Sequence, residues 1–81
     1  MKIALDYDKT YTEAPQMWDE FIELAEKYGH EVLIVTMRKP KEEITDVDAR
    51  IVYTSRKAKA KCVTADIWID DSPHYIYQDA F

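Results

Sequence analysis

Residues 2–12 read KIALDYDKTYT, a short apolar run that ends in two aspartates and a threonine with the spacing DxDxT. Three similar apolar runs follow, each ending in polar residues: VLIV at 32–35, IVY at 51–53 and IWI at 67–69. Continuous β-branched runs without polar alternation are typical of parallel strands that are covered on both faces. The sequence therefore predicts four strands in a small parallel sheet.

A helix is expected between the first two strands. Pro15 suits its first turn, and Gly29 suits the position just past its end. Apolar residues between these two positions recur at three- and four-residue steps, with most of the acidic residues on the other face. The segment between the strands is therefore predicted to form an amphipathic crossover helix.

Two further helices complete the predicted order. One is expected to start at Pro40 and to direct Ile44 and Val47 inward, and a shorter one is expected over residues 57–63. Alternating strands and helices predict a three-layer, Rossmann-like α/β sandwich. Since crossovers between parallel strands are right-handed, we expect the strand order 4-1-2-3, with the first strand central.

Length and composition narrow the class of protein. The 81 residues predict a single domain over 1–81, and the 11 basic and 16 acidic residues give a net charge of −5, which argues against a general nucleic-acid or anionic-membrane binder. One glycine excludes a Gly-rich phosphate loop, and one cysteine excludes an intrachain disulfide or a multi-cysteine zinc site. Because no apolar run approaches about 18 residues and no signal-peptide pattern is present, we expect a cytoplasmic protein with no membrane partner. Exposed edges in so small a sheet favour a homo-oligomer.

Candidate functional residues follow the predicted strands. In parallel sheets, ligands bind beyond the carboxyl ends of the strands. The residues at this edge are Asp6, Asp8, Thr36, residues 55–57, Asp70 and Asp71. Four carboxylates, a hydroxyl group and a nearby lysine are thus expected to converge on one site.

These residue types suit magnesium-dependent phosphate chemistry. Clustered carboxylates need a cation, and hard oxygen ligands from Asp6 with Asp70 or Asp71 select Mg²⁺. A carboxylate beside the ion could attack phosphorus and form an aspartyl-phosphate. Asp8 is placed to protonate the leaving oxygen and then to deprotonate water. Thr36 could donate a hydrogen bond to the phosphoryl group, while a lysine neutralises developing charge.

The motifs resemble those of the haloacid dehalogenase superfamily of phosphohydrolases. In order along the chain they are IALDYDKTYT at 3–12, VLIVTMR at 32–38, a lysine within SRKAKAK at 55–61, and ADIWIDDSP at 65–73. The resemblance implies that Asp6 is the nucleophile and a metal ligand, and that Asp8 is the general acid and base, with its backbone carbonyl also on the metal. Asp70 and Asp71 are implied as further metal ligands.

The resemblance also implies phosphate-binding residues. Thr10 would hold the DxDxT loop, and Thr36 would bind the transferring phosphoryl group. The third-motif lysine lies among Lys57, Lys59 and Lys61. Lys57 is favoured because it comes first after the strand, where a helix start faces the site, and Lys59 is second. A further candidate for substrate contact is Arg38, with a surface ion pair to the region of Glu42 and Glu43 as its alternative.

One feature of the resemblance concerns the substrate. Most members carry a cap domain, and neither gap between the motifs has room for one here. A capless member has an open site suited to large substrates, and the basic residues 56–61 favour a nucleotide or a nucleic-acid end as the phosphorylated substrate.

Two alternatives belong to other classes. A response-regulator receiver domain, a phosphoacceptor, uses similar residues, but its acid pair comes first along the chain, whereas the double aspartate is last here. A catalytically silent binding module of the same fold is the other alternative. Each motif taken alone can also be explained without any chemical role, because aspartates are common in turns and lysines on solvated helix faces.

Overall fold

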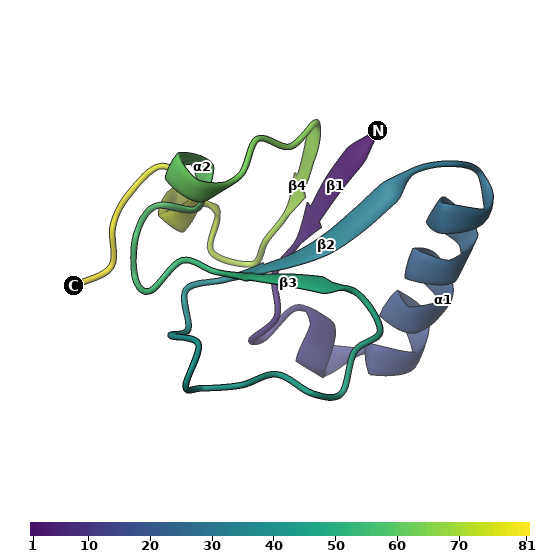
Figure 1. Cartoon of the computed structure of the whole chain (residues 1–81), viewed down its shortest axis with the longest axis horizontal. Coiled ribbons are helices and arrows are strands. Elements are labelled where there is room, and N and C mark those ends of the chain that lie inside the picture. The colour runs from purple at the N-terminus through teal and green to yellow at the C-terminus, as the bar shows by residue number, and fades with distance from the viewer.

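Four parallel strands form a single sheet in the computed structural model, which describes residues 1–81. The strands are β1 (Lys2–Leu5), β2 (Glu31–Thr36), β3 (Arg50–Tyr53) and β4 (Ile67–Ile69). Their order is β3-β2-β1-β4, which is the predicted order 4-1-2-3 counted from the opposite edge (Figure 1). The predicted parallel α/β architecture and the central position of the first strand are confirmed.

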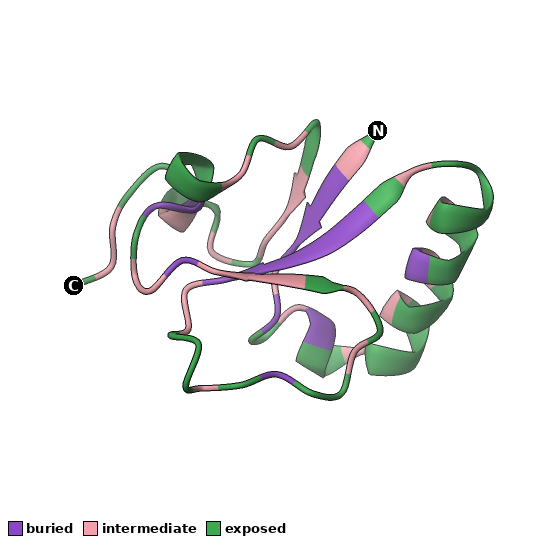
Figure 2. Ribbon diagram, viewed as in Figure 1, coloured by how far each residue is buried: buried purple, intermediate pink, exposed green.

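The central strands carry the core. Ile3 of β1 pairs with Val32 of β2 on one side and with Ile67 of β4 on the other. Figure 2 shows the buried residues concentrated in β1 and β2, whereas β3 and β4 are only partly buried. The apolar sequence of the two inner strands therefore matches their coverage on both faces.

One face of the sheet is covered by α1 (Pro15–Lys27) and by the short 3-10 helix η1 (Tyr11–Glu13). Ile22 of α1 is buried in the main core cluster, and Trp18, Phe21 and Ala25 pack against it. A second group of apolar side chains stays in solvent, since Met17 and Leu24 of α1 and Tyr28 just after it are exposed. The inward face of the helix is thus narrower than its apolar periodicity suggests.

Gly29 ends α1 as predicted, with a left-handed backbone at φ +83°. The N–H groups of Gly29 and His30 donate to the carbonyl oxygens of Glu26 and Ala25, at 3.0 Å in both cases. This pair of bonds is the Schellman arrangement, in which glycine avoids the steric cost that a side chain brings to the left-handed region.

Replacing Gly29 with alanine is expected to destabilise the protein by about 1 kcal/mol. A Cβ at this position meets no atom within 4 Å, so the loss comes from backbone conformation alone. Thermal denaturation followed by circular dichroism should show a melting temperature lower by about 4–8 °C for a domain of this size. Gly29→Asn should lose less, because asparagine tolerates the left-handed region. Equal melting temperatures for wild type and Gly29→Ala would contradict this account.

The helix predicted from Pro40 does not form, and this prediction is wrong. Residues 40–49 run as turns and irregular chain, although Ile44 is buried and Val47 packs against the core as expected. Tyrosine hydroxyl groups hold the segment instead: Ile44 N–H donates to Tyr53 Oη at 2.9 Å, and Tyr11 Oη donates to the Asp46 carbonyl at 3.1 Å. β-branched residues and aspartates favour helices weakly, so these contacts prevail.

The other face of the sheet has a thinner covering. Ala4, Leu33 and Val35 are buried there beneath Val63, Ala65 and neighbouring side chains. The third predicted helix, 57–63, is shorter than expected: α2 spans Lys59–Cys62 and packs near the 3-10 helix η2 (Pro73–Ile76). Figure 1 shows α1 and α2 on opposite sides of the view. The second helical layer of the predicted three-layer sandwich is thus reduced to one turn and a loop.

The helices are too short and too polar for a membrane span; none of them combines the length and apolar character that crossing a bilayer requires.

Candidate functional site

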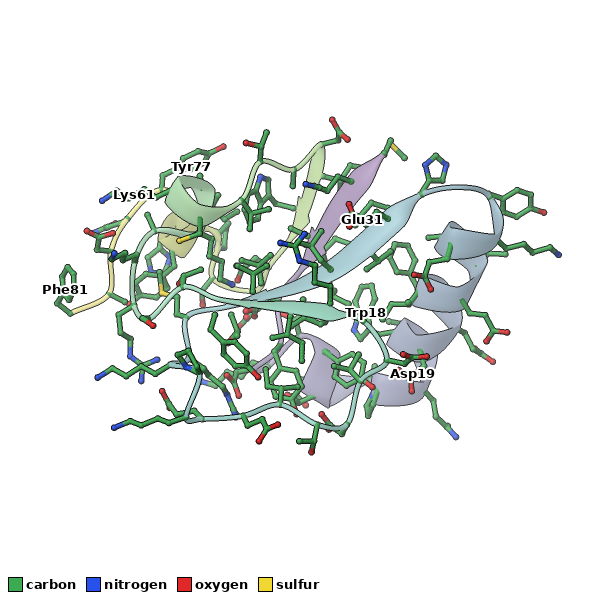
Figure 3. All side chains as sticks on the ribbon, viewed as in Figure 1. Trp18, Asp19, Glu31, Lys61, Tyr77 and Phe81 are labelled. Atoms are coloured by element: carbon green, nitrogen blue, oxygen red, sulfur yellow. The ribbon has the colours of Figure 1, made fainter.

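An open pocket of about 400 Å³ lies beyond the carboxyl ends of the strands. Four carboxylates and four cationic side chains line it: Asp6, Asp8, Asp70, Asp71, Lys9, Arg38, Arg56 and Lys59. The C-terminal segment adds Tyr75, Ala80 and Phe81 to the wall, and Figure 3 shows Phe81 at the end of the molecule away from α1. The expected convergence of charged residues on this edge is present.

Asp6 is the first residue after β1, and its backbone is fixed to the neighbouring strand. Its N–H donates to the Ile69 carbonyl of β4 at 2.9 Å, which continues the ladder by one step. Its carboxylate is 11 % exposed and accepts hydrogen bonds from Thr10 Oγ1 at 3.0 Å and from Lys59 Nζ at 2.7 Å. The Asp6 side chain is therefore held at the floor of the pocket.

Lys59 joins the ends of β1 and β4. Its side chain is 3 % exposed, and Nζ donates to Asp6 Oδ1 at 2.7 Å and to Asp70 Oδ2 at 2.6 Å. The Asp70 carboxylate is 4 % exposed, and its other oxygen accepts the Ser72 N–H at 2.9 Å. The two carboxylates compensate the buried ammonium group, which would be costly to bury without a partner.

Asp71 completes a cluster of acids that could hold a metal ion. Oxygen atoms of Asp6, Asp70 and Asp71 lie within 4.8 Å of one another. Thr10 Oγ1 lies 3.1 Å from Asp71 Oδ1 and accepts the Asp71 N–H at 3.3 Å, which orients the residue beside Asp6. Three carboxylates provide the hard oxygen donors that Mg²⁺ prefers, so the donor set fits the predicted ion. The Asp8 carboxylate does not belong to this cluster.

Burial shifts the ionisation of Asp6. Burial raises the pKa of the Asp6 carboxyl to about 6 despite the opposing effect of the Lys59 ammonium, and Asp71 and Asp70 add to the rise. The pKa of the neighbouring Asp71 is lowered, chiefly by its hydrogen bond with Asp6. Without a metal ion, Asp6 is thus the carboxyl of this pair that holds a proton at mildly acidic pH.

Asp8 returns to the same pocket through a tight turn. Lys9 adopts a left-handed φ of 65°, and the N–H groups of Tyr11 and Thr12 donate back to the carbonyls of Asp6 and Tyr7 at 3.3 and 3.1 Å. The turn places Asp8 at the pocket rim rather than at its floor, because Asp8 is exposed and Asp6 is not. This fits the expectation that the turn brings both aspartates over one site.

Arg38 clasps the Asp8 carboxylate with two hydrogen bonds, from Nε at 3.0 Å and from Nη2 at 2.8 Å. These bonds lower the pKa of Asp8 and keep it ionised. The guanidinium also stacks 5.0 Å from the centre of the Tyr7 ring, and Nη1 donates to the Glu42 carbonyl at 3.3 Å. The alternative of a surface ion pair with the Glu42 carboxylate is not realised, since Arg38 pairs with Asp8.

Thr36, the last residue of β2, is 1 % exposed and lines the pocket. Its Oγ1 accepts the Arg38 N–H at 3.2 Å. The hydroxyl hydrogen remains available to a ligand, because a hydroxyl group both accepts and donates. Thr10 and Thr36 therefore lie where the sequence places them, one beside the acids and one on the pocket wall.

The preference for Lys57 over Lys59 is wrong. Lys57 is exposed and does not line the pocket, whereas Lys59 is buried against two acids. The cause is a turn before α2: the Lys57 N–H donates to the Thr54 carbonyl at 3.1 Å, and Thr54 Oγ1 donates to the Lys57 carbonyl at 2.8 Å. This turn delays the helix start by two residues. Lys61 points away and pairs with Asp79 at 3.1 Å.

Two cationic residues of the pocket have no individual role in the sequence interpretation. Lys9 is only a spacer within DxDxT, and Arg56 is expected at this edge only as one of residues 55–57 and of the basic run 56–61. Arg56 enters the pocket because Ser55 and Arg56 have left-handed φ values of 53° and 71°. No glycine or asparagine marks this turn in the sequence, so no local signal predicts the geometry.

The raised pKa of Asp6 predicts an unusual pH dependence of stability in metal-free protein. The folded-state pKa of about 6 exceeds the ordinary aspartate pKa of 3.8, so the folded state binds the extra proton between these pH values. Stability contributed by Asp6 is therefore present below about pH 4 and is lost as the pH rises through 6.

Asp6→Asn removes this dependence and keeps the hydrogen-bonding shape. Relative to wild type, the variant should gain on the order of 1–3 kcal/mol between pH 4 and pH 7. Urea denaturation at four pH values in EDTA measures the difference. A constant difference across this range would contradict an elevated pKa for Asp6.

No family model matches the chain, and no curated protein or solved structure matches it either.

Proposed function

We propose that the protein is a magnesium-dependent phosphatase that acts through an aspartyl-phosphate on Asp6, and that it is a capless member of the haloacid dehalogenase superfamily. One observation carries the proposal: a buried Asp6–Lys59–Asp70 bridge, with Asp71 beside it, at the carboxyl ends of two adjacent parallel strands. The motif order along the chain supports the family assignment.

The reaction would begin at the Asp6 carboxylate. An Asp6 oxygen attacks phosphorus, and the bond between phosphorus and the leaving oxygen breaks. Asp8, which would take up a proton from solvent once it has separated from Arg38, donates that proton to the leaving oxygen. Asp8 then takes a proton from water, the hydroxide oxygen attacks phosphorus, and the acyl–phosphate bond breaks to release inorganic phosphate and the Asp6 carboxylate. The pair that Asp8 forms with Arg38 has to open before Asp8 can reach the substrate.

The remaining residues stabilise and position charge. Lys59 would neutralise the transferring phosphoryl group, and the free hydroxyl hydrogen of Thr36 would bond one of its oxygens. Asp6, Asp70 and Asp71 would hold Mg²⁺, which supplies Lewis-acid stabilisation of the phosphoryl oxygens when bound. Because the Lys59 ammonium bonds both Asp6 and Asp70, ion binding requires these contacts to rearrange.

The test is a panel of phosphomonoesters assayed for phosphate release with Mg²⁺ and with EDTA. Release that requires Mg²⁺ supports the proposal. The same rate in EDTA would remove the metal from the mechanism. No release from any ester would favour the silent binding module.

A further inference from the structure

Two arginines meet at the pocket rim on loops that are joined to each other. The loop after β2 carries Arg38, and the loop after β3 carries Arg56. Their backbones are bonded together: the Ser55 N–H donates to the Arg38 carbonyl at 3.2 Å, and the Arg56 N–H donates to the Met37 carbonyl at 2.9 Å. These main-chain contacts thus fix the backbones of Arg38 and Arg56 relative to each other.

The backbone under Arg56 adopts a conformation that its residues disfavour. Ser55 and Arg56 are consecutive non-glycine residues with left-handed φ values of 53° and 71°. Such conformations are uncommon outside glycine and asparagine, and they concentrate at binding and catalytic sites. The turn directs Arg56 toward the pocket, where its Nη1 bonds the Met37 carbonyl at 2.9 Å.

Both guanidinium groups retain hydrogen-bonding capacity. Arg38 makes three side-chain hydrogen bonds, two to Asp8 and one to Glu42. Arg56 makes one, and its Nη2 lies 3.6 Å from the Glu42 carboxylate. A guanidinium group has five N–H donors, so each arginine has donors left for a ligand in the pocket.

The two carboxylates next to these arginines, those of Asp8 and Glu42, leave room for another anion. The side chains of Asp8 and Glu42 are 53 % and 38 % exposed, so they can turn into solvent when another anion arrives. Lys9 adds a third positive charge to the same pocket. Bidentate geometry makes arginine a favoured partner for phosphate groups.

We propose that Arg38 and Arg56 form a second anion-binding subsite, so that the preferred substrate carries a second phosphate or phosphodiester group on its leaving-group side. This proposal rests on the proposed function for the assignment of Asp6 as the reacting end. Arg38 then exchanges Asp8 for the second anion, which frees Asp8 to face the substrate. The subsite would select against simple monophosphates.

Equilibrium binding tests the subsite without turnover. Titration calorimetry with Mg²⁺ on the Asp6→Asn protein compares adenosine monophosphate with adenosine 3′,5′-bisphosphate and a 5′-phosphorylated dinucleotide. At least one of the two ligands that carry a second phosphate or phosphodiester group should bind about 10-fold more tightly than the monophosphate, since a hydrogen bond to a charged group contributes that much. The two ligands distinguish a phosphate from a phosphodiester as the second anion.

Three variants test whether Arg38 and Arg56 cause the tighter binding of ligands with a second anionic group. Arg56→Gly removes the side chain, and because glycine suits φ 71° the variant should fold. It should reduce the preference for the ligand with a second anionic group over adenosine monophosphate at least 5-fold. Its affinity for the monophosphate itself should change less than 3-fold. Arg38→Gln should act in the same direction. Arg50→Gln is the matched control, because Arg50 is exposed at the start of β3, at the opposite edge of the sheet, and it should leave the preference unchanged.

The outcomes separate this proposal from the phosphatase. Equal affinities for all three ligands, or a preference that survives in both Arg56→Gly and Arg38→Gln, would overturn the subsite even if wild type releases phosphate. A preference that both variants remove supports the subsite even if wild type shows no turnover, a result that would count against the phosphatase alone.

Discussion

Asp6→Asn is expected to lower Mg²⁺-dependent phosphate release by at least about 10³-fold, because the attacking carboxylate is lost. The asparagine amide cannot form the acyl-phosphate, although it preserves the shape of the side chain. Its oxygen can still accept from Lys59, and its N–H group can donate to Thr10 Oγ1, which lies 3.0 Å from Asp6 Oδ2. The loss should therefore occur in a folded protein. Initial rates at saturating substrate measure it.

The control for this variant is Asp48→Asn, which removes an exposed carboxylate outside the pocket. It should retain wild-type turnover and wild-type stability. Phosphate release by Asp6→Asn within 10-fold of wild type would show that another group attacks phosphorus, and it would reduce the Asp6 cluster to a structural ion pair.

Lys59→Met has the second large expected effect, on both activity and stability. The variant leaves Asp6 and Asp70 without the ammonium that lies 2.7 and 2.6 Å from their carboxylates. Breaking a buried ion pair from one side costs about 3–5 kcal/mol, so urea denaturation in EDTA at pH 7 should show a much weaker protein. Because the two carboxylates then lack a cation, Mg²⁺ should restore more stability to Lys59→Met than it adds to wild type.

Turnover by Lys59→Met, assayed with Mg²⁺ so that the protein is folded, should fall by about 10²-fold or more. Lys57→Met is the matched control two residues away, and its side chain is exposed. It should match wild type in both measurements. The reverse pattern, with Lys57→Met impaired and Lys59→Met active, would contradict the role that the geometry suggests for Lys59.

Much of the site could be predicted because it depends on strand ends. Asp6, Thr36 and Asp70 each follow an apolar run directly, and parallel pairing brings the ends of such runs to one edge. The first helix could be predicted for a local reason as well, since Pro15 and Gly29 are compatible with a helix start and a helix end.

The failed predictions depend on contacts between distant parts of the chain. The segment after Pro40 satisfies its backbone through the hydroxyl groups of Tyr11 and Tyr53, and no local pattern reveals these bonds. Likewise, the start of α2 is set by the left-handed turn at Ser55 and Arg56, whose N–H groups bond the loop after β2. Lys59 rather than Lys57 therefore faces Asp6, a shift of two residues that periodicity could not resolve.

The central claim is that Asp6 takes the phosphoryl group while Asp8 moves protons, and Asp8→Asn with an activated aryl phosphate tests it most directly. A good leaving group needs no protonation, so phosphorylation proceeds while hydrolysis of the intermediate is slow. Rapid mixing with Mg²⁺ should show a burst of aryl alcohol near one equivalent, and mass spectrometry should place the phosphoryl group on Asp6. No burst and no covalent phosphate on Asp6 would contradict the account.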